Sequence, residues 1–282
     1  MNVAQQPIPI AARPYSERQQ IVVVDGPSER PARDPEAEEE RVERIERIAG
    51  VATMIFIPFG YWLGKAAARQ LLKAKEQGVE VLPVSRSEAA SLTFPPGHPK
   101  TRRVLYIGHP TIPSVYYPAA SFHRLTFEHK LSEAVRLLMA LGASQIEVER
   151  EYGWSKEFAA RLNVPLGTPG ASAGLGAGTQ RDSAAQILFS ARLRNTATPA
   201  VPEGLVWYPH EETWKTVAGA RLQHGLQEFS LTVNYEDDFG VDASLEANLA
   251  GTRIGLGGKF VTHEATSWRM VGTFADPGTT PG

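Results

Sequence analysis

The chain has 282 residues, 42% of them hydrophobic and 21% charged, with a formal net charge of −2. This length suffices for one large domain or two small ones, and the composition is that of an ordinary globular protein. The small net charge argues against a dedicated nucleic-acid-binding protein, which needs a basic surface. The absence of cysteine excludes disulfides, thiolate nucleophiles and cysteine-type zinc sites.

The first segment, residues 1–34, is rich in proline, arginine, glutamine and serine and is predicted to be largely disordered. Within it, the hydrophobic run 21–24 is expected to form a short strand that docks onto a sheet. The segment shows neither the apolar core nor the cleavage site of a secretory signal. We therefore expect a cytoplasmic protein, with membrane association as an open alternative.

The second segment, residues 35–78, is predicted to contain a charged helix, an apolar run and a basic helix. Asp34 and Pro35 give the first helix a good N-cap and a proline at its first position. Gly78 ends the basic helix. Between the two helices, residues 48–64 (IAGVATMIFIPFGYWLG) carry no charge at all.

The uncharged run 48–64 has three interpretations: a hairpin buried in the protein's own core, a membrane-inserted or membrane-lying segment, or a partner-binding element. Spanning a bilayer takes about 20 apolar residues, with about 17 as the lower edge, and Pro58 would kink a helix formed here. Aromatic residues next to cations are typical of an interfacial anchor. The candidate membrane or partner contacts are Met54, Ile55, Phe56, Ile57, Phe59, Tyr61, Trp62, Lys65 and Arg69.

The third segment, residues 79–164, is predicted to be a β-β-α-β unit. Strands are expected over 79–84 and 103–107, a strong helix over 119–141, and a half-buried strand over 145–152 in which hydrophobic and acidic residues alternate. A short helix is expected after Ser155, and the Gly/Ala-rich stretch 165–179 is predicted to be a flexible linker.

The last segment, residues 180–275, is predicted to be an antiparallel β-meander with one covering helix over 211–224. Hydrophobic and polar residues alternate over 186–194, 229–235, 241–249, 253–262 and 268–274. The expected fold class is therefore α+β, in which the meander follows the β-β-α-β unit and the N-terminal helical segment. The meander and the 79–164 unit are expected to share one sheet, because neither has enough strands to close a core alone.

No cofactor or metal is expected from the motifs. Gly174, Gly176 and Gly178 form G-x-G-x-G, but the dinucleotide fingerprint needs a third glycine at a wider spacing, so no dinucleotide is expected. The sequence contains no phosphate-binding P-loop, no H-E-x-x-H pair and no G-x-S-x-G nucleophile motif.

Scattered histidines and glutamates leave an enzymatic alternative open. Its candidates are His109 at a predicted strand end, His123 and Glu128 on the long helix, and His210 in a loop. A histidine held by local backbone groups is the competing interpretation for His109.

The sequence thus favours a non-enzymatic protein that contacts a membrane or assembles with copies of itself, with a pore-forming-type effector as one form of this hypothesis. Amphipathic hairpins suit a lipid-exposed barrel, and they suit any soluble sheet equally. The alternatives are an enzyme built from the scattered residues and a soluble scaffold or partner-binding module.

Overall fold

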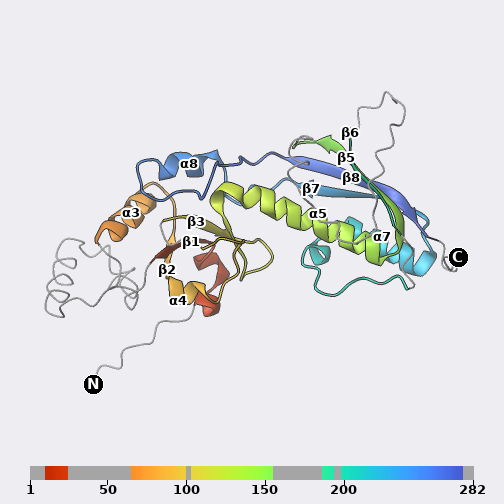
Figure 1. Ribbon diagram of the computed structural model, residues 1–282, viewed down its shortest axis with the longest axis horizontal. Helices are drawn as coiled ribbons and strands as arrows, with labels where there is room; N and C mark the ends of the chain where they lie inside the picture. The colour runs from red at the N-terminus through yellow and green to blue at the C-terminus, as the bar shows by residue number, and fades with distance from the viewer. Residues whose placement is uncertain (1–9, 25–64, 100–102, 155–185, 194–197, 276–282) are drawn as a thin grey trace, which may run out of the picture. The chain divides into compact units, whose positions relative to one another are not determined.

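The computed structural model describes residues 10–24, 65–99, 103–154, 186–193 and 198–275, with the backbone alone over 65–69 and 186–189. These residues form helices and two four-stranded sheets, which confirms the α+β class. The chain divides into two compact units (Figure 1). Unit 1 consists of residues 1–122 and 239–262, and unit 2 consists of residues 123–238 and 263–282.

Unit 1 is built around a mixed sheet with the strand order β2-β1-β3-β4. β1 pairs parallel with β2 and antiparallel with β3, which pairs antiparallel with β4. Hydrophobic residues on alternate positions of β1 enter two different clusters, so the sheet carries a core on each face. The strands are β1 (Gln20–Val24), β2 (Leu82–Ser85), β3 (Leu105–Gly108) and β4 (Tyr116–Pro118).

Unit 1 also contains helices of three to twelve residues. Ser85 and Glu88 cap the start of α4 in a reciprocal capping box, and a left-handed Gly78 follows the end of α3. The helices are η1 (Ile10–Ala12), η2 (Tyr15–Glu17), α3 (Lys65–Glu76), α4 (Arg86–Ala89), η5 (Ala119–Ser121) and α8 (Ala243–Leu249).

Helix α3 is fixed to the segment that contains α8. Ala74 is fully buried in a cluster that includes Leu245. The Lys73 ammonium donates to the carbonyl of Gly251 at 3.0 Å, and the backbone N–H of Arg253 donates to the Gln70 side chain at 2.8 Å. The chain is therefore anchored to unit 1 within a few residues of position 65.

Unit 2 is an antiparallel sheet with the order β6-β5-β8-β7. Helix α5 lies along one face of it (Figure 1), where the Phe127 ring contacts the rings of Trp268 and Tyr235. The elements are α5 (Phe122–Ala140), β5 (Ala143–Tyr152), β6 (Gln186–Arg192), η6 (Tyr208–His210), α7 (Glu212–His224), β7 (Glu228–Tyr235) and β8 (Thr266–Phe274).

A buried arginine holds the far end of unit 2 together. The Arg221 guanidinium donates from α7 to the carbonyls of Leu141, Leu226 and Ala275, which lie after α5, before β7 and after β8. It also lies over the Phe274 ring. Three backbone carbonyls accept hydrogen bonds from this buried group.

The predicted four-stranded meander is wrong in its middle. Residues 241–249 contain the helix α8 instead of a strand, because the buried residues there recur every fourth position, at Val241, Leu245 and Leu249. The Asp242 side chain accepts the Ser244 N–H at the start of that helix. Residues 253–262 form no strand beyond an isolated bridge between Val104 and Gly255.

The strands of the 79–164 segment divide between the two sheets. β5, from the 79–164 segment, pairs with β6 and β8 of the C-terminal segment, whereas β2, β3 and β4 belong to the other sheet. In the N-terminal segment, the strand predicted over 21–24 is present as β1, whereas η1 and η2 stand where disorder was predicted. The charged helix from Asp34, the run 48–64, the short helix after Ser155 and the linker 165–179 lie outside the described residues.

Candidate functional site

Three titratable rings meet inside unit 2. His123, at the start of α5, is fully buried, and its Nδ1 atom lies 2.9 Å from the hydroxyl of Tyr235 at the end of β7. The ring of His263, which precedes β8, lies 5.2 Å from that of His123 and 5.7 Å from that of Tyr235. The fold thus gathers groups that lie far apart in the sequence.

The protonation pattern of this cluster follows from its burial. Burial raises the pKa of the Tyr235 hydroxyl, and the negative charges of Asp237 and Asp238 raise it further. The tyrosine hydroxyl is therefore neutral, and it shares a hydrogen bond with His123 Nδ1 whose direction depends on the tautomer of the imidazole.

Aromatic side chains surround this cluster. The ring centroid of Trp154 lies 5.5 Å from that of Tyr235 and 5.4 Å from that of Phe127. The Phe127 ring also contacts the ring of Trp268. His263 Nε2 is buried and makes no hydrogen bond among the described residues. Two imidazoles and a tyrosine hydroxyl are groups that serve in acid–base catalysis, which makes this cluster the candidate functional site.

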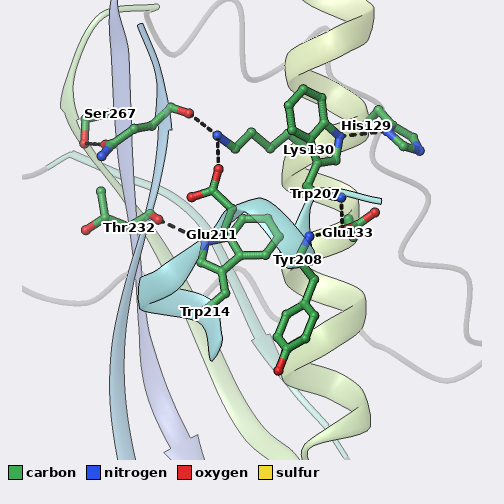
Figure 2. Close-up of polar contacts among 10 residues, drawn as sticks. His129, Lys130, Glu133, Trp207, Tyr208, Glu211, Trp214, Thr232 and Ser267 are labelled. Atoms are coloured by element: carbon green, nitrogen blue, oxygen red, sulfur yellow. Dashed lines mark hydrogen bonds and ion pairs between the residues drawn. The ribbon is translucent and has the colours of Figure 1, made fainter. Parts of the chain in front are cut away.

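A second polar network fixes the segment before α7 to α5 (Figure 2). The buried carboxylate of Glu133 accepts the backbone N–H groups of Val206, Trp207 and Tyr208 at 2.7, 2.7 and 2.8 Å. The indole N–H of Trp207 donates to His129 Nδ1 at 3.0 Å. Burial lowers the pKa of His129, and this outweighs the opposing effect of Glu133, so His129 is a neutral acceptor.

Lys130 completes this network. Its ammonium group forms an ion pair with Glu211 at 2.5 Å, donates to the carbonyl of Asn234 at 2.7 Å and lies 5.2 Å from the ring of Trp207 (Figure 2). These contacts are one ion pair, one hydrogen bond to the backbone and one cation–π contact. The arrangement therefore makes Lys130 a structural clamp.

Of the four predicted catalytic candidates, His123 alone lies in the histidine–tyrosine cluster. His109 is fully buried in unit 1, and its Nδ1 accepts the N–H groups of Thr111 and Ile112 at 3.2 Å each. Glu128 pairs with Arg124 at 2.5 Å, and burial raises its pKa. His210 is exposed in η6. These residues therefore have different hydrogen-bond and ion-pair partners.

The candidate membrane or partner contacts are mostly undescribed. Met54, Ile55, Phe56, Ile57, Phe59, Tyr61 and Trp62 lie outside the described residues, and Lys65 and Arg69 belong to α3 by their backbone alone. Within the part of the chain that the structure describes, no helix combines the length and apolarity needed to cross a bilayer. No group of three histidines or carboxylates there is arranged to hold a metal ion.

Sequence reasoning missed Tyr235, His263 and the Lys130–Glu211 clamp. One local signal exists for the clamp: Lys130 and Glu133 precede the fully buried Leu137 by seven and four residues, which places all three on one side of a helix. Charged residues on a buried face need partners. No local signal exists for Tyr235 or His263.

Comparisons of the chain with protein-family models, curated proteins and solved structures find no significant match.

Proposed function

We propose that this chain is a non-enzymatic protein that associates with membranes and assembles with copies of itself. Residues 48–64 make the membrane contact in this proposal. The observation that carries it is the uncharged composition of that run, next to the cations Lys65 and Arg69. In a cell, the protein is expected to divide between the cytoplasm and a membrane surface.

The anchoring of α3 supports this proposal. Ala74, Lys73 and Gln70 fasten the helix to unit 1 within ten residues of the apolar run. Binding of the run to a membrane would therefore hold unit 1 close to the membrane surface.

The state of the candidate catalytic residues adds support. His109 Nδ1 accepts local backbone N–H groups, and Glu128 pairs with Arg124. Groups held this way contribute to stability without needing a substrate.

Vesicle flotation tests the membrane contact. The full chain is expected to float with vesicles of phosphatidylcholine and phosphatidylglycerol, and a variant with Phe56→Asp and Ile57→Asp is expected to stay in the lower fraction. Leu222→Asp is the matched control, because Leu222 is 46% exposed on unit 2, away from the run in sequence. The proposal fails if the wild type does not float, or if the double variant floats as well as it does.

Pore formation is a stronger form of the same proposal. It predicts that the wild type releases a trapped dye from these vesicles and that the double variant does not. Binding without release would leave a peripheral membrane protein.

An enzyme is the second candidate, and the buried His123–Tyr235–His263 cluster favours it. A screen of ester and phosphodiester substrates with the wild type and His123→Gln tests this candidate. A turnover that the variant loses while its circular dichroism is unchanged would favour the enzyme over the membrane protein.

A further inference from the structure

Residues 200–211 form a strap that runs along α5 and leads into α7. At one end, the backbone N–H of Ala200 donates to the carbonyl of Ala140 at 3.1 Å. At the other end, Glu211 pairs with Lys130 at 2.5 Å. The strap contains η6 and no strand, so contacts with α5 hold it in place instead of pairing in the sheet of unit 2.

Side chains on one face of α5 hold the middle of the strap. The Arg136 guanidinium donates to a strap carbonyl, and the Glu133 carboxylate accepts the backbone N–H groups of 206–208. One turn earlier in α5, His129 Nδ1 accepts the indole N–H of Trp207 at 3.0 Å (Figure 2). These three positions of α5 recur at intervals of three and four residues, so they share one face of the helix.

The hydrogen bond between Trp207 and His129 has one possible direction. An indole nitrogen can only donate, so His129 Nδ1 carries no proton while this bond exists. A neutral imidazole meets this condition with its proton on Nε2, whereas an imidazolium carries protons on both nitrogens. Protonation of His129 therefore breaks the bond and turns two donors toward each other.

The charged groups of α5 around His129 act in opposite directions. Burial has the largest effect and lowers the pKa of His129, the Glu133 carboxylate raises it, and the Arg136 guanidinium lowers it. An imidazolium at His129 would also attract Glu133, one helical turn away, in competition with the three strap N–H groups that this carboxylate accepts. Protonation thus weakens two attachments of the strap together.

The strap carries charged and titratable groups of its own. Glu211 is paired with Lys130, while Glu203 and His210 are exposed. His210 is a second histidine of the strap, so a test must separate its protonation from that of His129.

We infer that protonation of His129 in mildly acidic solution releases residues 205–208 of the strap from α5, while the sheet of unit 2 stays folded. The strands of this sheet pair with one another and not with the strap. Release exposes Leu205 and Trp207, which are 9% and 6% exposed in the closed strap. The strap is thus a pH-sensitive device, and it does not depend on the membrane contact proposed above.

Thiol labelling can measure the release, because the chain contains no cysteine. Leu205→Cys places a single thiol at a buried position of the strap, and Leu222→Cys places one at a position of α7 that is 46% exposed. Dithiodipyridine labels thiols in mild acid as well as at neutral pH. Dividing the labelling rate of Leu205→Cys by that of Leu222→Cys at each pH gives a relative rate from which the effect of pH on the thiol itself is removed.

The relative rate of Leu205→Cys is expected to rise by about tenfold between pH 7 and pH 5. Uptake of one proton by a histidine of ordinary pKa in the open strap limits this rise to about 25-fold. Val233→Cys, at a fully buried position of β7, reports on opening of the sheet. Its relative rate, taken in the same way, is expected to stay constant.

Two histidine variants, each made in the Leu205→Cys chain, assign the response. His129→Gln keeps an acceptor for the Trp207 indole and takes up no proton, so its relative rate should be the same at both pH values. His210→Gln is the matched control, because His210 is an exposed histidine of the same strap, and this variant should keep the rise.

Trp207→Phe guards against a His129 variant that does not fold. It removes the indole donor and leaves the histidine in place, so its relative rate should already be raised at pH 7. The inference is overturned if Leu205→Cys shows no rise in acid, if Val233→Cys shares the rise, or if a folded His129→Gln variant retains it. A Trp207→Phe variant that is labelled at pH 7 as slowly as Leu205→Cys alone also overturns it.

Discussion

The Nδ1 atom of His123 and the hydroxyl of Tyr235 lie 2.9 Å apart across 112 residues of sequence, and both groups are buried. Burial keeps the tyrosine hydroxyl neutral, so it is able to donate to the imidazole nitrogen or to accept from it. The bond links the beginning of α5 to the end of β7. It is therefore both a tertiary contact of unit 2 and the centre of its candidate site.

Replacing Tyr235 with phenylalanine should lower the free energy of unfolding by about 1–3 kcal/mol, since the buried His123 Nδ1 would lose its hydrogen-bond partner. Tyr152→Phe is the control: Tyr152 is 45% exposed, and its bond to Glu236 competes with water, so a change within about 0.5 kcal/mol is expected. Urea unfolding measures both. Equal losses in the two variants would contradict the argument.

Tyr235 also predicts the response to alkaline pH. Its pKa is raised in the folded state, so above about pH 10 the unfolded chain releases a proton that the folded chain keeps. The free energy of unfolding should therefore fall as the pH rises above 10, and it should fall less steeply in Tyr235→Phe. Parallel falls in urea unfolding across this range would refute the assignment.

His129 predicts the response to acid. Its pKa is lowered by burial from the ordinary value of 6.5, so below that pH the unfolded chain binds a proton that the folded chain refuses. Stability should fall as the pH drops from 7 to 5. His129→Gln keeps an acceptor for the Trp207 indole and does not titrate, and it should lose less stability over the same interval. Urea unfolding at the two pH values, followed by tryptophan fluorescence, makes the comparison.

The Lys130–Glu211 pair should be far more costly to break than an exposed pair. The side chains are 10% and 20% exposed, so Lys130→Met leaves a mostly buried carboxylate and should cost about 3 kcal/mol or more. The exposed pair Lys215–Glu212 has the same chemistry, and Lys215→Met should cost less than about 1 kcal/mol. Adding Glu211→Gln to Lys130→Met should recover part of the loss, and an additive double variant would count against a coupled pair.

Two glycines of unit 2 should respond in opposite ways to alanine. A Cβ atom at Gly272, in β8, would lie 1.9 Å from the backbone oxygen of Gln145, so Gly272→Ala should destabilise by about 1–3 kcal/mol or more. Gly219 lies inside α7 with nothing within 4 Å of such an atom, and Gly219→Ala should stabilise by about 0.5–1 kcal/mol. Thermal unfolding of both variants checks the contrast in sign.

The sequence predicts most elements of unit 2 correctly where the pattern has a single explanation. In β5, Ile146 and Val148 are buried while Glu147, Glu149 and Glu151 are not, as the alternation predicts. The same holds for β7. A long run in which hydrophobic and polar residues alternate fits a strand and does not fit a helix.

The segment 241–249 shows why the prediction of a strand failed there. Its apolar residues occupy every second position only if Ala243 and Ala247 are counted, and both alanines are exposed. The residues that are buried, Val241, Leu245 and Leu249, follow a period of four. Alanine fits either pattern, so only tertiary burial decides between strand and helix.

The candidate site could not be predicted for a different reason. His123 was identifiable as a residue type on a helix, but Tyr235 and His263 become its neighbours through the pairing of β7 with β8. Pairing between strands depends on the whole fold. Until the strand pairing is known, the sequence shows which reactive residue types are present but does not show which of them lie together.

The three passages of the chain between the units have a consequence for biosynthesis. Unit 1 needs residues 241–249, where Val241 and the α8 residues Leu245 and Leu249 join its core, and unit 2 needs β8, which lies between β5 and β7. Both arrive late, so a nascent chain released at residue 238 contains neither unit complete. A premature stop codon there would leave both units incomplete. To express either unit alone, two separated stretches of the gene must be joined.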